Sequence, residues 1–569
     1  MAARSIPAPG TAELPAANAA ALLRRNGTES TIADRPAVRF EDRVITHGEF
    51  LAESTRWANL FLAQPPSTPD GVLHVGVLLD NIPEYLFALG GAALSRSVIV
   101  GLNHTRRDEH LWRDIEHTHC GLLISEQRHL PLLETITNKL PPMLVVEDDL
   151  PAVISGQSAE DAGIEPDVNS RWALIFTSGT SSAPKAVICT QRRLLQTGAR
   201  MAIIMDLGPD DTGYICMPLF HSNALMVGWA PSIAVGASVG LARKFTASGW
   251  LDDIRRYGST YFNYTGKPLS YLVATPEKPD DADNPLRVAF GNEGSPEVVE
   301  TFSRRFGVEV IDAFGATEGG IAVSREDGVK PGSVGKVTET VKVVDPEGNE
   351  LPRAKLADDG SLNNADECVG EIVNTAGAGP FEGYYNNDEA TSSTLRGGWY
   401  WSGDLGYVDD DGFLYFAGRT ADWLRVDGEN FPAGPIEAAV GRHPDVVLAA
   451  VYGVPDEHAG DQIMVGLQLR DGATFDPAAF AQFIDGLPDV GPKWRPRYVR
   501  VVHDFPTTGT NKIVKRTLVR QKYRRDLCGD DSLYVRDRGA DSYRTFTNDD
   551  EAALHAVLER AGRGRFWDL

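Results

Sequence analysis

Short apolar runs alternate with helical patterns through the first half of the chain, and this alternation restricts the fold more than any other feature. Val75–Leu79 has the composition of a buried strand, and Pro83–Leu94 follows it as a helix with an apolar face. Arg287–Phe290 and Val308–Ile311 are further apolar runs, each followed by a glycine-rich turn. Alternating strands and helices predict an α/β domain with mostly parallel sheets.

The pattern changes near residue 333. From Val334 to Val344 apolar and polar side chains alternate, and turn signals such as Pro346–Asn349 and Asp358–Gly360 become frequent. Asp409–Gly412 is another hairpin turn between two apolar runs. These features predict an antiparallel sheet, a small β-barrel at about 333–418 attached to the α/β body.

The 569 residues are too many for one hydrophobic core, so we expect several domains. The clearest boundary lies at Gly418–Asp422. The segment beyond it has its own strands and helices and predicts a small α+β domain. We therefore expect a disordered segment over 1–20, a large domain over 21–418, a hinge over 419–422 and a C-terminal domain over 423–569.

Composition excludes several classes of function. A net charge of −24 argues against a nucleic-acid binder and against electrostatic adhesion to anionic lipid. The five cysteines are scattered and never form a Cys-x-x-Cys pair, which is typical of a reducing compartment and argues against a zinc site. The N-terminus lacks a signal-peptide core, and no run approaches ~18 apolar residues. We predict a soluble, cytoplasmic protein.

The segment Phe176–Lys185 follows an apolar strand, Trp172–Phe176, with a loop of hydroxyl residues that ends in proline and lysine. Backbone N–H groups and hydroxyls in such a loop can surround oligophosphate oxygens, and the lysine adds positive charge. The loop is not a Walker A sequence, because Pro184 stands where the second glycine is required. A flexible surface loop is the alternative interpretation, and this segment alone does not decide between the two.

Four further segments accompany this loop: Met217–His221, Asp312–Gly320, Trp399–Asp404 with Gly418–Arg419, and Pro506–Lys512. The order and spacing of the five segments resemble the adenylate-forming superfamily, which includes acyl-CoA synthetases, luciferases and peptide-synthetase adenylation domains. The resemblance runs from about residue 35 to residue 520. It implies a large N-terminal domain of two α/β subdomains plus a β-barrel, joined by the hinge to an α+β domain that moves during the reaction.

A closer resemblance lies within that superfamily. Arg243–Tyr257, Gly291–Gly294, Arg425–Asn430 and Leu533–Asp537 resemble the branch of very-long-chain acyl-CoA synthetases and fatty acid transport proteins. That branch includes actinobacterial members that activate steroid side-chain acids. The resemblance implies an acid–thiol ligase that converts a hydrophobic acid, ATP and CoA to acyl-CoA, AMP and pyrophosphate through an acyl-adenylate, with Mg²⁺ as cofactor.

Alternatives to a fatty-acid substrate remain open. They are a steroid acid, transfer of the acyl group from acyl-AMP to a carrier protein, and a nucleotide-binding sensor or scaffold without catalysis. Peripheral membrane contact and a homodimer are both compatible with the sequence.

The resemblance also implies site residues for the nucleotide. The phosphate loop would use Thr177, Ser178, Gly179, Thr180, Ser181 and Lys185; Gly291, Asn292, Glu293, Phe314, Gly315 and Ala316 would surround the adenine; Asp404 and Arg419 would bind the ribose. Thr317 would bond the α-phosphate, and Glu318 would hold Mg²⁺, which prefers oxygen ligands. Glu318 as a helix-start carboxylate and Phe314 as a core aromatic are the structural alternatives.

Lys512 would enter from the C-terminal domain and bridge the carboxylate and phosphoryl oxygens, with Lys515 as the weaker candidate. His221 would line the junction of acyl pocket and CoA tunnel, or be an ordinary interior histidine. The CoA-side residues would be Arg425, Gly428, Glu429 and Asn430, and the hinge residues Ala421 and Asp422.

Three positions depart from the family pattern. Ser182 replaces a second glycine of the phosphate loop, Ala421 replaces the usual Asp or Lys of the hinge, and Asn511 replaces the glycine before the lysine. The last departure also occurs in the very-long-chain branch.

Overall fold

The computed structural model describes residues 10–177, 185–292, 294, 296–321, 323–324, 330, 332–356, 362–419, 423–426, 429–455, 461–487, 490–491, 494–508, 512–560 and 567. The chain divides into two compact units. The first comprises 1–293, 299–322 and 376–400, and the second comprises 294–298, 323–375 and 401–569. The predicted hinge at 419–422 does not coincide with this division, and the domain boundaries stay predictions.

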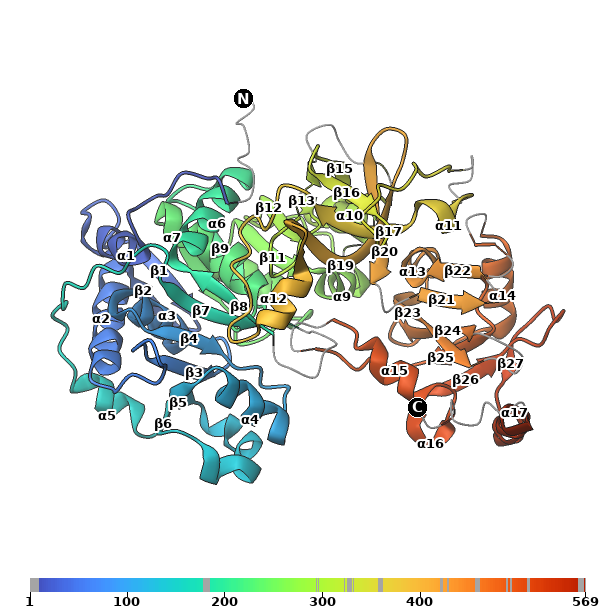
Figure 1. Cartoon of the computed structure of the whole chain (residues 1–569), viewed down its shortest axis with the longest axis horizontal. Coiled ribbons are helices and arrows are strands. Elements are labelled where there is room, and N and C mark those ends of the chain that lie inside the picture. Colours follow the sequence, from blue (N-terminus) through green and yellow to red (C-terminus); the bar gives the residue numbers. More distant parts are fainter. Residues whose placement is uncertain are drawn as a thin grey trace. The chain divides into compact units, whose positions relative to one another are not determined.

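The first unit contains two sheets whose strands run mostly parallel (Figure 1). One has the order β13-β12-β11-β9-β10-β1-β2 and the other β6-β5-β3-β4-β7-β8. The strands of the first sheet are β1 (Pro36–Phe40), β2 (Arg43–Thr46), β9 (Thr212–Ile215), β10 (Ser238–Leu241), β11 (Tyr261–Thr265), β12 (Val288–Asn292) and β13 (Glu309–Asp312). Those of the second are β3 (His74–Leu78), β4 (Val98–Gly101), β5 (Cys120–Ser125), β6 (Met143–Val145), β7 (Arg171–Phe176) and β8 (Ala186–Thr190).

The parallel sheets confirm the predicted α/β fold class. Only the edge strands β2 and β8 pair antiparallel with their neighbours. The parallel strands are buried on both faces, as β3 and β4 show at every position. The predicted strand Trp172–Phe176 corresponds to β7, and the predicted helix Pro83–Leu94 to α3 (Pro83–Ser95).

The other helices of the first unit connect and cover these strands. They are α1 (Ala19–Thr28), α2 (His47–Leu62), α4 (Asp108–His117), α5 (Leu150–Ser155), α6 (Gln191–Ile204), α7 (Ala230–Val235), α8 (Trp250–Tyr257), α9 (Gly266–Ala274), α10 (Pro296–Phe306) and α12 (Asp388–Thr394). The first residues of α10 belong to the second unit. The first unit also contains the 3₁₀ turns η1 (Gln127–Leu132) and η2 (Glu134–Lys139), the π-helix η3 (Asn223–Trp229) and the short strand β18 (Leu395–Arg396).

The start of the chain differs from the prediction of disorder over 1–20. The side chain of Asn18 accepts the N–H of Ala21 at 2.7 Å and caps α1, and Ala19 and Ala20 are buried. The prediction was wrong for residues 18–20, because the alanines that suggested disorder are also the strongest helix formers. Residues 1–9 lie outside the described residues.

The second unit holds an antiparallel sheet in the order β14-β15-β20-β19-β17-β16, which confirms the antiparallel pattern predicted after residue 333. Its strands are β14 (Val323–Ser324), β15 (Gly335–Val337), β16 (Val341–Val344), β17 (Gly370–Asn374), β19 (Trp399–Val408) and β20 (Phe413–Arg419). The predicted hairpin turn at Asp409–Gly412 joins β19 to β20.

The C-terminal part of this unit is α+β, as predicted. A two-stranded sheet, β21 (Trp423–Val426) with β22 (Glu429–Pro432), precedes a five-stranded sheet of β23 (Val446–Pro455), β24 (Asp461–Leu469), β25 (Tyr498–Val501), β26 (Ser532–Val535) and β27 (Arg544–Thr545). The helices of this part are α13 (Ala433–Gly441), α14 (Pro477–Asp485), α15 (Lys515–Gln521), α16 (Arg525–Cys528) and α17 (Asn548–Arg560), whereas the short helix α11 (Ala365–Cys368) precedes β17 of the antiparallel sheet. In the described part of the chain, no helix is both long and apolar enough to cross a membrane.

Candidate active site

The predicted phosphate loop joins β7 to β8. Phe176 pairs with Ala186, and the N–H of Thr177 donates to the carbonyl of Lys185 at 3.0 Å, which closes the base of the loop. Trp172, fully buried in β7, anchors the strand by donating its indole N–H to Leu89 O at 3.0 Å. The loop residues Ser178, Gly179, Thr180, Ser181 and Ser182 lie outside the described residues.

Tyr384 lies between two predicted site residues, Lys185 and Glu318. The Lys185 ammonium is 5.5 Å from the centre of the Tyr384 ring, and the Tyr384 hydroxyl donates to Glu318 Oε1 at 2.7 Å. This hydrogen bond uses one of the two carboxylate oxygens. The structure therefore brings Lys185 and Glu318 to one place through a residue that the sequence analysis missed.

The turn that carries Thr317 and Glu318 is fixed by α6. Arg193, 5% exposed, donates to Ile188 O at 3.1 Å and to the carbonyl of Thr317. The hydroxyls of Thr317 and Ser222 share a hydrogen bond of 3.0 Å. The Thr317 hydroxyl is thus held beside the segment that follows β9. Arg193 and Ser222 had no signal of their own in the sequence.

The predicted adenine wall is close-packed at Gly291. A Cβ on Gly291 would lie 2.4 Å from the carbonyl oxygen and 2.6 Å from the ring of Tyr264, so only glycine fits there. The Tyr264 hydroxyl donates to Asp312 Oδ2 at 2.8 Å, which connects β11 to the start of the Asp312–Gly320 segment. Phe314 is partly exposed, whereas Gly315 and Ala316 are exposed.

Asn292 offers an acceptor suited to an adenine base. Its Oδ1 is buried and has no hydrogen-bond partner among the described residues. A buried acceptor without a donor is costly, and an exocyclic amino group would satisfy it. Glu293, the third residue predicted here, lies outside the described residues.

His221 precedes the π-helix η3, a rare element that often occurs at functional sites. Its Nδ1 accepts the N–H of Asn223 at 3.3 Å, so the neutral ring carries its proton on Nε2. Asn223 donates to Tyr264 O at 3.0 Å and accepts from Asn263 Nδ2 at 2.6 Å, which anchors the start of η3 to β11. Trp229 at the other end of η3 stacks on Trp172 with ring centres 6.0 Å apart.

In the second unit, Asp404 and Arg419 are partners on neighbouring strands. They pair directly between β19 and β20, and Asp404 is 6% exposed. The hydroxyl of Ser402 accepts the Asp404 N–H at 3.1 Å. Their role in binding the ribose stays a prediction, because the Arg419 side chain lies outside the description.

Arg425 and Asn430 pair across the β21–β22 hairpin, next to Glu429. The side chains of these three residues are not described, and Gly428 and the hinge residues Ala421 and Asp422 also lie outside the described residues.

Lys512 lies in a hairpin of the second unit. Its carbonyl accepts the N–H of Thr508 at 2.8 Å, and its N–H donates to the Thr508 hydroxyl at 3.1 Å. Lys515 instead pairs with Glu437, whose Oε1 lies 2.9 Å from the ammonium and also accepts the Val451 N–H at 2.7 Å. Lys515 therefore holds α15 to α13 and β23. The role of Lys512 stays a prediction. Asn511 lies outside the described residues.

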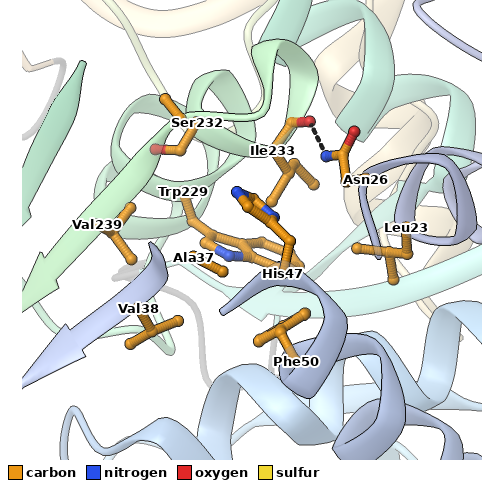
Figure 2. A pocket seen from close by; sticks show the side chains of 11 residues that line it. Leu23, Asn26, Ala37, Val38, His47, Phe50, Trp229, Ser232, Ile233 and Val239 are labelled. Atoms are coloured by element: carbon orange, nitrogen blue, oxygen red, sulfur yellow. Dashed lines mark hydrogen bonds between the residues drawn. The ribbon is translucent and has the colours of Figure 1, made fainter. Parts of the chain in front are cut away.

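A small buried cavity lies in the first unit at the amino ends of β1 and β10 (Figure 2). His47 lies over Trp229 there, and Asn26 donates to Ile233 O at 2.7 Å. Burial lowers the pKa of His47 to about 4. Since ligands of parallel sheets bind at the carboxyl ends of the strands, this cavity is separate from the candidate site.

Comparisons with known proteins test the predicted family. The model of the AMP-binding enzyme family matches residues 25–385, and that of the AMP-binding enzyme C-terminal domain matches residues 435–512. Steroid-22-oyl-CoA synthetase of Rhodococcus jostii is 44% identical over 542 residues, covering 94% of this chain and 96% of the relative. A medium/long-chain-fatty-acid–CoA ligase of Mycobacterium tuberculosis is 45% identical over 498 residues, covering 86% and 94%.

Solved structures show the same fold. An anthranilate CoA ligase in complex with anthranoyl-AMP superimposes with a TM-score of 0.77 at 24% identity, covering 88% of this chain and 96% of that one. ATP-bound MatB from Rhodopseudomonas palustris gives a TM-score of 0.75 at 24% identity, covering 90% and 100%. The solved structures confirm the predicted fold class. The family matches and the relatives confirm the predicted resemblance and the prediction of an acid–thiol ligase. Its sequence, fold and two family matches show that the chain belongs to the AMP-binding enzyme family.

Proposed function

We propose that the protein is an ATP-dependent acyl-CoA synthetase that converts a long or very-long-chain fatty acid, ATP and CoA to acyl-CoA, AMP and pyrophosphate. The observation that carries this proposal is the group of Lys185, Tyr384, Glu318 and Thr317 at the base of the loop after β7. The group combines a cation, a carboxylate and a hydroxyl, which suit a nucleoside triphosphate and its metal ion.

In the first half-reaction, a carboxylate oxygen of the acid attacks the α-phosphorus of ATP, and pyrophosphate leaves. Lys185 and the loop from Thr177 hold the β- and γ-phosphates, and the Thr317 hydroxyl bonds the α-phosphate. Glu318 would hold Mg²⁺, which would supply positive charge to the phosphate oxygens when bound. Asp404 and Arg419 bind the ribose, and Lys512 neutralises charge between the carboxylate and the α-phosphate.

In the second half-reaction, the CoA sulfur attacks the acyl carbonyl carbon and AMP leaves. The C-terminal domain turns about residues 419–422, withdraws Lys512 and brings the hairpin from Arg425 to Asn430 to the CoA chain. His221, whose Nδ1 accepts the Asn223 N–H, lines the path between the acid and CoA. The segments 219–235 and 261–271, which include η3 and α9, form the wall around the acyl chain.

A steroid acid is the second candidate substrate. The observation that favours it is the 44% identity over 94% of the chain to a steroid-22-oyl-CoA synthetase. The mechanism is the same for both acids, so the two candidates differ only in the shape of the acyl wall.

The test is a panel of fatty acids of increasing length and steroid side-chain acids, each incubated with purified protein, ATP, Mg²⁺ and CoA. We expect acid-dependent release of AMP and pyrophosphate and an acyl-CoA detectable by mass spectrometry. Folded protein that releases neither product with any acid would contradict the proposal. Acyl-AMP that accumulates despite CoA would favour a carrier protein as acceptor, and ATP binding without turnover would favour a sensor.

Lys512→Ala with Lys515→Ala as its matched control tests the two half-reactions. We expect Lys512→Ala to lose adenylation yet still convert preformed acyl-AMP and CoA to acyl-CoA. Lys515→Ala should keep both half-reactions, because its ammonium is engaged by Glu437, and should cost at most about 1 kcal/mol of stability. Equal loss of both half-reactions in Lys512→Ala would contradict the proposed role.

A further inference from the structure

Asn81 links the two parallel sheets of the first unit. It follows β3 of one sheet and is 2% exposed. Its Nδ2 donates to Met217 O at 2.8 Å and to Ala242 O at 3.1 Å, and its Oδ1 accepts the N–H of Leu219 at 2.9 Å. Met217 and Leu219 follow β9, and Ala242 follows β10, in the other sheet. One buried amide that follows a strand of one sheet therefore satisfies three backbone groups at the carboxyl ends of two strands of the other sheet.

These bonds hold the segment 217–222 from one side. Phe220 rests against the end of β4, where a Cβ on Gly101 would lie 3.0 Å from the Phe220 Cα. The next residues are His221 and Ser222, and Ser222 shares its hydrogen bond with Thr317. A chain of contacts thus runs from Asn81 through the backbone of 217–219 to a hydroxyl beside the predicted α-phosphate site.

A ring of charged and ionisable residues includes the residue before Asn81; its members are Asp80, Glu126, Arg128, His129 and Arg243. The N–H of Asp80 donates to Glu126 Oε2 at 2.6 Å, and Glu126 Oε1 lies 3.7 Å from the guanidinium of Arg243, the neighbour of Ala242. The Asp80 carboxylate pairs with Arg128 and with His129, whose Nε2 is 3.0 Å from Oδ1.

This ring contains the types of side chain that bind metal ions, but it lacks the excess negative charge that a divalent cation requires. Possible ligand atoms of Asp80, Glu126 and His129 all lie within 4.8 Å of one another. Each carboxylate already faces an arginine, and two guanidinium groups beside the cluster oppose a divalent cation. The cluster is a set of paired charges that links Asp80 to Arg243.

We propose that Asn81 is a positioning residue for the reaction: it sets the segment 217–222 so that His221 and Ser222 lie correctly at the site. The inference rests on the proposed function for its kinetic consequences, whereas the attachment of the segment can be tested without activity. Asn81 itself touches no substrate in this account. Its effect is on geometry, where a displacement of about 1 Å can cost ~100-fold in rate.

Two substitutions at Asn81 separate positioning from simple stability. Asn81→Leu removes all three hydrogen bonds. Asn81→Asp keeps the acceptor for Leu219 but turns a carboxylate oxygen toward the carbonyls of Met217 and Ala242. Protonation would let that oxygen donate to one of the two carbonyls, so lower pH should partly restore the site.

Asn26→Asp is the matched control (Figure 2). Asn26 is 2% exposed and also donates its amide to a backbone carbonyl, that of Ile233, at 2.7 Å. It lies by the cavity at the amino ends of β1 and β10, away from the site. The same substitution there should lower thermal stability and leave turnover unchanged.

The experiment measures kcat, KM for ATP and pyrophosphate exchange against pH. We expect Asn81→Leu to lower kcat by ~10- to 100-fold while KM for ATP changes less than about threefold. The kcat of Asn81→Asp, divided by the wild-type kcat, should rise as the pH falls. The kcat of Asn81→Leu, divided by the wild-type kcat, should not change with pH. A kcat that is unchanged, or that falls equally in Asn26→Asp, would overturn the positioning role.

Amide hydrogen exchange tests whether Asn81 holds the segment 217–222 in place, and this measurement does not require an active enzyme. Peptides that cover 217–222 should exchange faster in Asn81→Leu than in the wild type and in Asn26→Asp, because Leu219 has lost its acceptor. Unchanged exchange of this segment would refute the inference even if the wild type is an active synthetase. A wild type inactive with every acid would refute the proposed function alone.

Discussion

Removing one hydroxyl, in Tyr384→Phe, tests whether the proposed phosphate and metal residues act as a group. The Tyr384 hydroxyl donates to Glu318 Oε1 at 2.7 Å, and its ring faces the Lys185 ammonium at 5.5 Å. Phenylalanine keeps the ring and loses only the donor. Any change in adenylation then reports the orientation of Glu318.

The size of the effect follows from the geometry. A hydrogen bond to a charged group contributes about 1.5–3 kcal/mol. Glu318 is partly exposed, so water can replace part of the bond and the lower end applies. About 1.5 kcal/mol corresponds to a roughly tenfold loss in rate. Tyr384→Leu also removes the ring and should cost a further ~0.5–1 kcal/mol, because the cation–π contact with Lys185 is lost too.

The assay is acid-dependent exchange of labelled pyrophosphate into ATP, with a titration of Mg²⁺. Tyr385→Phe is the control, since the neighbouring hydroxyl bonds with His119 Nδ1 at 2.9 Å and its ring packs on His74, away from the site residues. We expect a tenfold loss and a higher Mg²⁺ requirement in Tyr384→Phe, and exchange within about twofold of wild type in Tyr385→Phe. Wild-type exchange in Tyr384→Phe, or equal losses in both variants, would refute the reasoning.

Two further predictions concern packing and pH. Gly291→Ala should destabilise the first unit by about 1–3 kcal/mol in thermal unfolding, because the added Cβ would lie 2.4 Å from Tyr264 O. Gly315→Ala is the control and should change stability little, since no described residue lies within 4 Å of its Cβ. Equal melting temperatures of the two variants would contradict this prediction. Burial lowers the pKa of His47 and of His74 from 6.5 to about 4, so the unfolded chain takes up these protons first. The contribution of each histidine to the free energy of unfolding should therefore be about 2 kcal/mol smaller at pH 5 than at pH 7. Urea titrations at pH 7 and pH 5, with His74→Gln reducing the difference, check this sign.

The fold could be predicted from the sequence because its signals are local. The apolar runs of buried parallel strands mark β3 and β7 to within a residue, and the turn at Asp409–Gly412 marks the β19–β20 hairpin. The antiparallel edges β2 and β8 and the π-helix η3 were not predicted. Periodicity reports burial, whereas strand direction and a helix of wider turn depend on contacts made by the whole unit.

The candidate site was predictable only where a residue belongs to a motif. Thr317, Glu318 and Lys185 lie in segments with a recognisable order, and the structure brings Lys185 and Glu318 together around Tyr384. Tyr384 itself reaches them because its segment pairs with the edge of β8, as an isolated bridge to Val187 shows. No property of the sequence near Tyr384 marks that pairing.

Two of the residues that were missed, Asn81 and Arg193, share one physical role. Parallel strands place their carboxyl ends at one edge, so loops there can contact a ligand whatever holds the sheets together. The geometry between the two sheets depends instead on buried side chains that bond to backbone, as Asn81 does at Met217 and Arg193 at Thr317. Such residues touch the carbonyls of a motif and not the ligand. Residues selected from the sequence for their ability to bind a ligand therefore include Thr317 and omit Arg193, although the bond from Arg193 to the Thr317 carbonyl helps to position the Thr317 hydroxyl.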